Sequence, residues 1–292
     1  MDKMRDTMIR LHAPRRWGQN FLVNEGAADT IIIAFRPEPH DLVLEIGPGR
    51  GVLTRRLAGR VQRLVAVEID PALAAPLRDD LSATPSVEIV GADVLELDLR
   101  SLFSNLGASE QRRARVIANL PYSIATAIIL RLLDERALIS DLLVLVQREV
   151  AERIASPPGS RAYGGLSVLC QARARVETLL RLRPGSFRPI PKVESGLVRL
   201  TPRPPEETDF VEGRDEPVTL ESLLRAAFAQ RRKTLLNNMA RFPGRRSVPI
   251  GARAAAGLIR GAGLDPGSRP EDVAVEGFLA LLRTLQALYS AP

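Results

Sequence analysis

The residues best suited to chemistry form a short turn, Asn119-Leu120-Pro121-Tyr122, directly after the apolar run Val116-Ile117-Ala118. The side-chain oxygen of Asn119 and the carbonyl oxygen of Leu120 can accept both hydrogens of one amino group. Pro121 has a fixed φ and no N–H, so it stiffens the turn. Tyr122 offers a flat face on which a base can stack. These four residues predict a site for a planar base that carries an amine.

Such a turn suits a reaction at the exocyclic amine of adenine, a poor nucleophile because its lone pair is delocalised into the ring. Two oxygens that accept the N–H hydrogens let the nitrogen pyramidalise, and orientation supplies most of the acceleration without a strong base. Phe187, which begins a proline-spaced loop, is a candidate to close the other face of the base. The alternatives are a strand-to-helix turn with a core tyrosine and a phenylalanine that packs a linker.

A glycine-rich turn, Gly47-Pro48-Gly49-Arg50-Gly51, follows an earlier apolar run at residues 42–46. Glycine lets the backbone approach a ligand closely and tolerates unusual dihedral angles. The glycine spacing is tighter than that of a dinucleotide fingerprint, and alone it is weak evidence for a ligand. We nevertheless expect Gly47 and Gly49 to contact a nucleoside cofactor, because two carboxylates follow at suitable places.

Glu68 ends the next apolar run, about 20 residues beyond the first glycine, where a carboxylate can accept both ribose hydroxyls of an adenosine. Asp93 follows the run at residues 87–90 and can accept the adenine amino group. The carboxyl ends of parallel strands line the crevice where open α/β sheets bind ligands. The alternative for each acid is an ordinary strand-end carboxylate. Together with the amine-binding turn, the set predicts methyl transfer from S-adenosylmethionine to a nucleobase nitrogen.

Apolar runs that alternate with helix-like stretches must position these residues. The runs lie at residues 42–46, 64–67, 87–90, 116–118 and 142–146, and the helical stretches at 52–58, 71–81, 123–133 and 149–155. This alternation is typical of a parallel sheet covered on both faces. Asn24 is expected to cap an earlier helix that runs through residues 31–35. Two late extended segments, 174–182 and 193–201, predict an antiparallel pair at the end of the sheet.

We expect a flexible basic arm at residues 1–16, a cofactor-binding domain at 17–203 and a helical domain at 204–292, because the boundary segment 201–207 is rich in proline. Helical patterns follow at 220–228, 234–239, 252–259 and 273–288. No acidic residue occurs from 222 to 264. Basic side chains in this stretch predict an RNA-phosphate surface rather than a merely solvated face; those we expect to bind RNA are Arg225, Arg231, Arg232 and Lys233.

Composition narrows the function class. The chain of 292 residues has a net charge of +7, which favours a nucleic-acid partner. Cys170 is the only cysteine and His12 and His40 the only histidines, so we expect no metal site. The Gly-x-Ser-x-Gly element is missing, which argues against a Ser-His-Asp hydrolase. No apolar stretch approaches the roughly 20 residues that cross a bilayer. We expect a cytoplasmic monomer with no membrane partner.

Several stretches resemble the ribosomal RNA adenine N6-dimethyltransferases, from about Ala13 to the C-terminus. They are Gly18-Gln19-Asn20-Phe21-Leu22, Glu45-Ile46-Gly47-Pro48-Gly49-Arg50-Gly51, Asn119-Leu120-Pro121-Tyr122 and Phe187-Arg188-Pro189-Ile190-Pro191-Lys192-Val193-Glu194-Ser195. The run Ala227-Phe228-Ala229-Gln230-Arg231-Arg232-Lys233-Thr234-Leu235 is similar to the small-subunit enzymes of that family. It resembles the antibiotic-resistance branch, which acts on large-subunit (23S) RNA, less well.

The resemblance implies a Rossmann-like, class I S-adenosylmethionine-dependent methyltransferase fold: an α/β fold with a seven-stranded sheet and a small C-terminal α-helical domain. It also implies dimethylation of two adjacent adenines in the 3′-terminal hairpin of small-subunit (16S) rRNA, on an assembling subunit. Carried over residue by residue, the cofactor contacts are Asn20, Leu22, Gly47, Glu68, Asp93 and Asn119. The sequence departs from the usual pattern of the family at Ala118 and at residues 123–127, but these departures remove none of the expected cofactor contacts. The alternative from a different functional class is a non-catalytic assembly factor, and the intact motifs argue against it.

Overall fold

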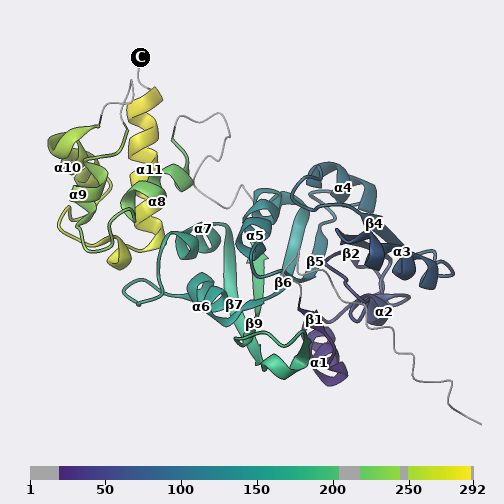
Figure 1. Ribbon diagram of the computed structural model, residues 1–292. Coiled ribbons are helices and arrows are strands. Elements are labelled where there is room, and N and C mark those ends of the chain that lie inside the picture. The colour runs from purple at the N-terminus through teal and green to yellow at the C-terminus, as the bar shows by residue number, and fades with distance from the viewer. Residues whose placement is uncertain (1–19, 204–217, 244–248, 291–292) are drawn as a thin grey trace, which may run out of the picture.

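The computed structural model describes residues 20–203, 218–243 and 249–290, and its larger part is built on a mixed seven-stranded sheet (Figure 1). The strands lie in the order β4 (Val87–Gly91), β3 (Arg63–Glu68), β2 (Leu42–Ile46), β5 (Ala114–Asn119), β6 (Ile139–Gln147), β9 (Ser195–Pro202) and β7 (Ala174–Leu182). Neighbours are parallel from β4 to β6, whereas β9 is antiparallel to both β6 and β7. The predicted fold class is confirmed, including the antiparallel pair.

The strands at the centre of this sheet are mostly apolar because helices cover both faces. In β2, Leu42, Leu44 and Ile46 pack into one apolar cluster, while Val43 packs into another on the opposite face. Strand residues alternate between faces, so a strand covered on both sides is apolar at most positions. The helices along this part of the chain are α1 (Glu25–Phe35), α2 (Thr54–Leu57), α3 (Pro71–Asp80), α4 (Leu99–Leu106), α5 (Ala125–Asp134), α6 (Arg148–Ala155) and α7 (Gly165–Arg173).

The first helix begins where the sequence predicts. The Asn24 side chain accepts a hydrogen bond from the Ala27 N–H at 2.8 Å, which confirms it as the N-cap of α1. Helix α4 is not among the predicted elements. Neither is a small ladder in which β1 (Phe21–Leu22) pairs antiparallel with β8 (Phe187–Arg188).

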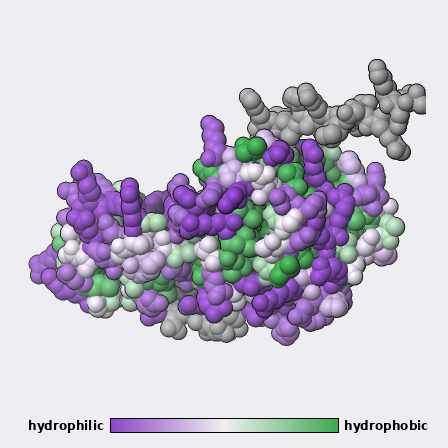
Figure 2. All heavy atoms as spheres, turned by 90° about the horizontal axis from the view of Figure 1, so that it is seen from below, coloured by the Kyte–Doolittle hydropathy of each residue, from purple (hydrophilic) through white to green (hydrophobic). Residues whose placement is uncertain are grey.

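Four later helices build a second apolar core at one side of the sheet (left in Figure 1). They are α8 (Leu220–Ala227), α9 (Leu235–Met239), α10 (Gly251–Gly261) and α11 (Val275–Ser290). The loop after α6 reaches this core, because the Tyr163 hydroxyl donates to the Val273 carbonyl at 2.9 Å. Seen from below, this helical part is mostly hydrophilic, whereas apolar patches lie over the sheet part (Figure 2). The arm at 1–16 lies outside the described residues, and the boundary near 204 stays a prediction.

Candidate functional site

The glycine-rich turn after β2 requires its glycines. Gly47 and Gly49 have φ angles of 69° and 56°, in the left-handed region that side chains disfavour. A Cβ added to Gly49 would lie 2.9 Å from the Phe21 ring, and one added to Gly47 would lie 3.2 Å from the backbone oxygen of Asn119. The second distance shows that the cofactor turn and the amine-binding turn, predicted separately, are direct neighbours.

Glu68 holds the glycine-rich turn in place. One of its carboxylate oxygens accepts from the Gly49 N–H at 2.9 Å, and the other accepts from the Asp70 N–H at 3.0 Å. The residue is buried, and this burial raises the pKa of its carboxyl group. Glu68 therefore shapes the turn as well as lining the pocket beside it.

Glu45, in β2, is a pocket residue to which sequence reasoning gave no role. It is 2% exposed, and its Oε2 has no hydrogen-bond partner within the described part of the chain. Burial, with the neighbouring Glu68 carboxylate adding to it, raises the pKa of Glu45 to about 8. The raised pKa means that Glu45 holds a proton near pH 7 in the empty site, because a buried carboxylate is costly. A ligand that brings positive charge would favour the ionised form. The available signal was an acid inside an otherwise apolar strand.

Asn119 ends β5 and faces the N-terminal segment. Its Nδ2 donates to the Asn20 carbonyl oxygen at 3.2 Å, which joins two predicted cofactor contacts that are 99 positions apart in the chain. The Leu120 N–H donates to the Leu145 carbonyl at 3.2 Å, and the Leu120 side chain is buried. The amine-binding turn is thus anchored on β6.

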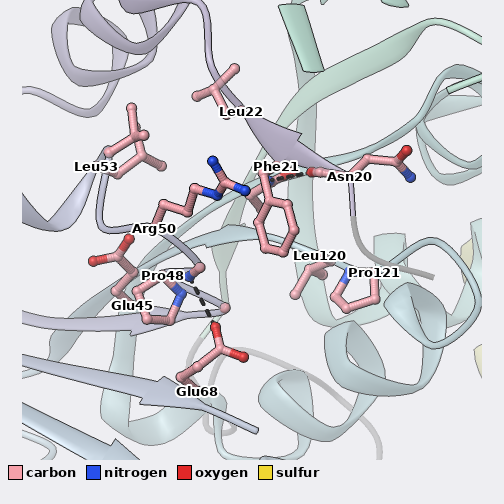
Figure 3. Close-up of a pocket in the computed structure, with 14 residues that line it drawn as sticks. Asn20, Phe21, Leu22, Glu45, Pro48, Arg50, Leu53, Glu68, Leu120 and Pro121 are labelled. Atoms are coloured by element: carbon pink, nitrogen blue, oxygen red, sulfur yellow. Dashed lines mark hydrogen bonds between the residues drawn. The ribbon is translucent and has the colours of Figure 1, made fainter. Parts of the chain in front are cut away.

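One pocket collects most of the predicted residues (Figure 3). Its predicted lining residues are Asn20, Leu22, Gly47, Gly49, Glu68, Asn119, Leu120 and Pro121, and the residues not predicted are Phe21, Glu45, Pro48, Arg50, Val52 and Leu53. The Arg50 guanidinium lies 5.5 Å from the centroid of the Phe21 ring. With these two side chains between the turns, the enclosed space is about 40 Å³. That is well below the roughly 300 Å³ at which ligand pockets begin.

Asp93 and Tyr122 lie outside the lining of this pocket. Asp93 follows β4 and accepts a hydrogen bond from the Leu95 N–H at 2.8 Å, with its side chain partly exposed. The Tyr122 hydroxyl is 2.7 Å from the Ser195 Oγ, and its ring is half-buried. The ligand contacts of both residues stay predictions.

Phe187 does not face the pocket. Its side chain is fully buried in the apolar cluster that contains Leu22 and Ile31, and its backbone pairs with Leu22 between β1 and β8. The prediction that this ring closes the other face of a base is wrong for the described conformation, because core side chains already surround the ring. Phe187 is the packing residue of the alternative interpretation.

The basic residues predicted to bind RNA lie on α8 and on the α8–α9 connection, and all four are exposed; they are Arg225, Arg231, Arg232 and Lys233. Arg231 differs from the others because its guanidinium donates to the Arg161 carbonyl in the loop before α7. Within the described residues, no group of three or more His, Cys, Asp or Glu side chains could hold a metal ion. No described helix has the length and apolar character needed to span a membrane.

Comparisons with known proteins bear on the whole chain. A small-subunit ribosomal RNA methyltransferase A from Acidobacterium capsulatum is 42% identical over 275 residues, which cover 94% of this chain and 92% of that protein. The enzyme of the same name from Geobacter metallireducens is 39% identical, with 95% and 97% covered.

Two solved structures have the same fold. A dimethyladenosine transferase from Plasmodium falciparum has a TM-score of 0.72 at 25% identity, covering 90% of this chain and 96% of that one. The 23S rRNA methyltransferase ErmE has a TM-score of 0.63 at 27% identity, covering 91% and 99%. The family model described as ribosomal RNA adenine dimethylase matches residues 10–250. With more than half of the chain matched and a relative at 42% identity, the chain belongs to the ribosomal RNA adenine dimethylase family.

Proposed function

We propose that this protein transfers methyl groups from S-adenosylmethionine to N6 of two adjacent adenines in the 3′-terminal hairpin of 16S rRNA. The products are N6,N6-dimethyladenosines made while the small subunit assembles. The observation that carries the proposal is the contact between Gly47 of the cofactor turn and the backbone of Asn119 in the amine-binding turn. A donor on the first turn lies next to an acceptor amine on the second.

The residues of the pocket fit the proposed cofactor. S-adenosylmethionine supplies an electrophilic methyl group on a sulfonium and carries an additional ammonium group. The glycine turn allows close backbone approach, and the unsatisfied Glu45 oxygen suits a cationic ligand. Asn20, Leu22 and Glu68 line the same space, and we assign the adenine amino group to Asp93 at the neighbouring strand end.

The amine-binding turn acts on the acceptor. The Asn119 side-chain oxygen and the Leu120 carbonyl accept the two N6 hydrogens, so the nitrogen lone pair turns toward the methyl group. Tyr122 supports a face of the base, and Pro121 restricts the turn. Acceleration comes from this alignment, and the proton leaves from the methylated ammonium afterwards.

Glu45 makes cofactor binding depend on pH. Below its pKa of about 8 the empty site holds a proton on this carboxyl. A cationic ligand favours the carboxylate, so binding near pH 7 should release up to about one proton and tighten as pH rises toward 8. Calorimetric titrations with S-adenosylmethionine, in buffers of different ionisation enthalpy, measure the released protons. Equal proton release by the wild type and Glu45→Gln would exclude this role.

The same substitution should change stability with a defined sign. The carboxyl of Glu45 binds its proton more tightly in the folded chain than at its ordinary pKa of 4.5. The folded state therefore loses stability relative to Glu45→Gln as pH rises from 4.5 to about 8. Urea unfolding at several pH values tests this, and a difference between the two proteins that does not vary with pH would contradict it.

The basic residues between α8 and α9 should contribute through phosphate contacts. Replacing Arg232 and Lys233 by alanine should weaken small-subunit binding and flatten the slope of log K against log salt by about 0.7–0.9 per lost contact. Arg231→Ala should have an additional, salt-independent effect because its bond to the Arg161 carbonyl is also lost. Arg60→Ala, an exposed arginine on the α2 side, is the matched control. Unchanged slopes would contradict the phosphate-contact assignment.

The choice of subunit separates this proposal from its closest alternative, which the likeness to ErmE motivates. The relatives named as small-subunit enzymes match over more than 90% of both chains, and this match favours the small subunit as the substrate. Undermethylated 30S and 50S particles incubated with labelled S-adenosylmethionine test it directly. We expect label in 16S rRNA, and label in 23S rRNA alone would overturn the substrate assignment.

A further inference from the structure

We infer that Ser195 is a positioning residue for the acceptor base, acting through the Tyr122 ring. The inference deepens the proposed function and rests on it. Its basis is the 2.7 Å contact between the Tyr122 hydroxyl and the Ser195 Oγ. This contact joins the amine-binding turn to a strand 73 positions later in the chain.

Ser195 is held on a rigid platform. It is the first residue of β9, is fully buried, and pairs with Gln147 of β6 on one side and with Leu182 of β7 on the other. The preceding residue, Glu194, is fixed by Arg148, whose N–H donates to its carbonyl at 2.9 Å and whose guanidinium lies 3.0 Å from its carboxylate. The Ser195 backbone therefore cannot shift without disturbing the three strands β6, β9 and β7.

The following residue restricts β9 further. A Cβ added to Gly196 would lie 2.6 Å from the Ala151 Cβ, so the strand lies directly against α6. Glycine permits this approach, and α6 blocks movement of the strand toward that side. Ser195 thus offers a hydroxyl from a fixed backbone position, 2.7 Å from the Tyr122 hydroxyl.

Tyr122, by contrast, belongs to a turn. The turn backbone is anchored at Leu120, whose N–H donates to the Leu145 carbonyl, and by the bond from the Ile124 N–H to the Pro121 carbonyl at 3.2 Å. These bonds fix the base of the side chain but not the direction of the ring. The contact with Ser195 fixes the far end, so the ring is held at both ends before any base arrives.

The contact persists over the working pH range. Burial raises the pKa of the Tyr122 phenol, so the hydroxyl stays protonated and able to donate or accept. A ring free to choose among rotamers would present its face to the base only part of the time. Because misplacement by about 1 Å can cost about 100-fold in rate, a partial loss of order should lower turnover without changing the cofactor site.

The test is a double-mutant cycle on 30S methylation with Tyr122→Phe, Ser195→Ala and both together. Each single variant should lower kcat about 10-fold with an unchanged KM for S-adenosylmethionine, the range expected for partial misplacement of a reacting group. The double variant should be no slower than either single one, because all three lack the same contact. Ser195→Thr, which keeps the hydroxyl, should retain most of the turnover.

A structural control separates positioning from stability. Ser167 on α7 is also fully buried, and its hydroxyl donates to the Arg153 carbonyl at 2.5 Å, outside the pocket. Ser167→Ala should lower the melting temperature but leave kcat unchanged. Additive losses in the cycle, or an unchanged kcat in Tyr122→Phe, would overturn the inference. Tyr122→Phe decides the case even if Ser195→Ala fails to fold, because it leaves β9 intact.

A second measurement needs no activity. The chain has three tyrosines, Tyr122, Tyr163 and Tyr289, so ring-labelled tyrosine gives few NMR signals, and Tyr122→Phe assigns one of them. In Ser195→Ala that signal should shift and broaden as the ring gains freedom, and an unchanged signal would overturn the inference. If wild-type protein fails to methylate 30S particles while the ring signal responds as expected, the proposed function fails and the positioning contact stands.

Discussion

Replacing Asn119 with alanine should abolish detectable methyl transfer while leaving small-subunit binding nearly intact. The side-chain oxygen that accepts an N6 hydrogen disappears, and loss of one preorganised acceptor or donor at a reacting centre costs about 100- to 1,000-fold in kcat. Because Asn119 Nδ2 also donates to the Asn20 carbonyl, we expect a loss of cofactor affinity as well, smaller than the loss in kcat. Single-turnover methylation with saturating cofactor measures the chemical step.

A matched variant controls for the loss of a buried amide. Asn238 in α9 is buried, and its Nδ2 donates to the Ala227 carbonyl at 2.7 Å within the helical core. Asn238→Ala should destabilise that core but leave the rate on bound particles unchanged. Product formation by Asn119→Ala at the wild-type rate would refute the acceptor assignment, and would favour a non-catalytic role for this turn.

Removing the Glu68 carboxylate should have the largest effect on cofactor binding. Glu68→Ala leaves the Gly49 and Asp70 N–H groups without the acceptor they have now. Each buried unsatisfied group costs about 1–3 kcal/mol, and the proposed ribose contact is lost as well. We expect the Kd for S-adenosylmethionine to rise at least about 100-fold, which corresponds to about 2.7 kcal/mol.

Two further variants sharpen this result. Glu68→Gln keeps the shape and one acceptor oxygen, so its Kd should lie between those of the wild type and Glu68→Ala. Glu88→Ala removes an exposed strand acid that pairs with Arg63 and should leave the Kd unchanged, since exposed ion pairs contribute little. A Kd for Glu68→Ala within twofold of the wild type would show that the carboxylate neither binds the ligand nor shapes its turn.

The parallel sheet was predictable because its central strands carry a local signal. A strand covered on both faces is apolar at nearly every position, as residues 42–46 are except for Glu45, and turn residues bound each run. The Asn24 cap was equally local, since a side chain bonds to a backbone group three positions away. The proximity of the motif residues at the ends of β2, β3 and β5 was then also predictable, because parallel strands bring their carboxyl ends to the same edge of the sheet.

Helix α4 was missed although its signal is present in the sequence. Asp98 accepts a hydrogen bond from the Ser101 N–H at 3.3 Å as N-cap, and Gly107 ends the helix with a φ of 96°. Leu99, Phe103 and Leu106 are buried at helical spacing between these ends. A search for cap pairs around short amphipathic stretches would have found this element.

Phe187 and Glu45 could not be assigned from local pattern. The proline-spaced loop left Phe187 either as a base-stacking ring or as a packing residue. Its burial depends on the pairing of β8 with β1, in which Phe187 lies opposite Leu22, 165 positions earlier in the chain. The Glu45 carboxyl has a raised pKa because helices and neighbouring strands bury it, and burial of one side chain is a tertiary property. In both cases the deciding contacts are distant in sequence.

The most direct test of the proposed reaction is mass-spectrometric mapping of modified nucleotides in 16S rRNA from undermethylated 30S particles treated with this protein and S-adenosylmethionine. The proposal predicts N6,N6-dimethyladenosine at two neighbouring adenines of the 3′-terminal hairpin, with neither formed by Asn119→Ala. Treated particles with no new modification in that hairpin, or methyl groups on atoms other than adenine N6, would contradict it.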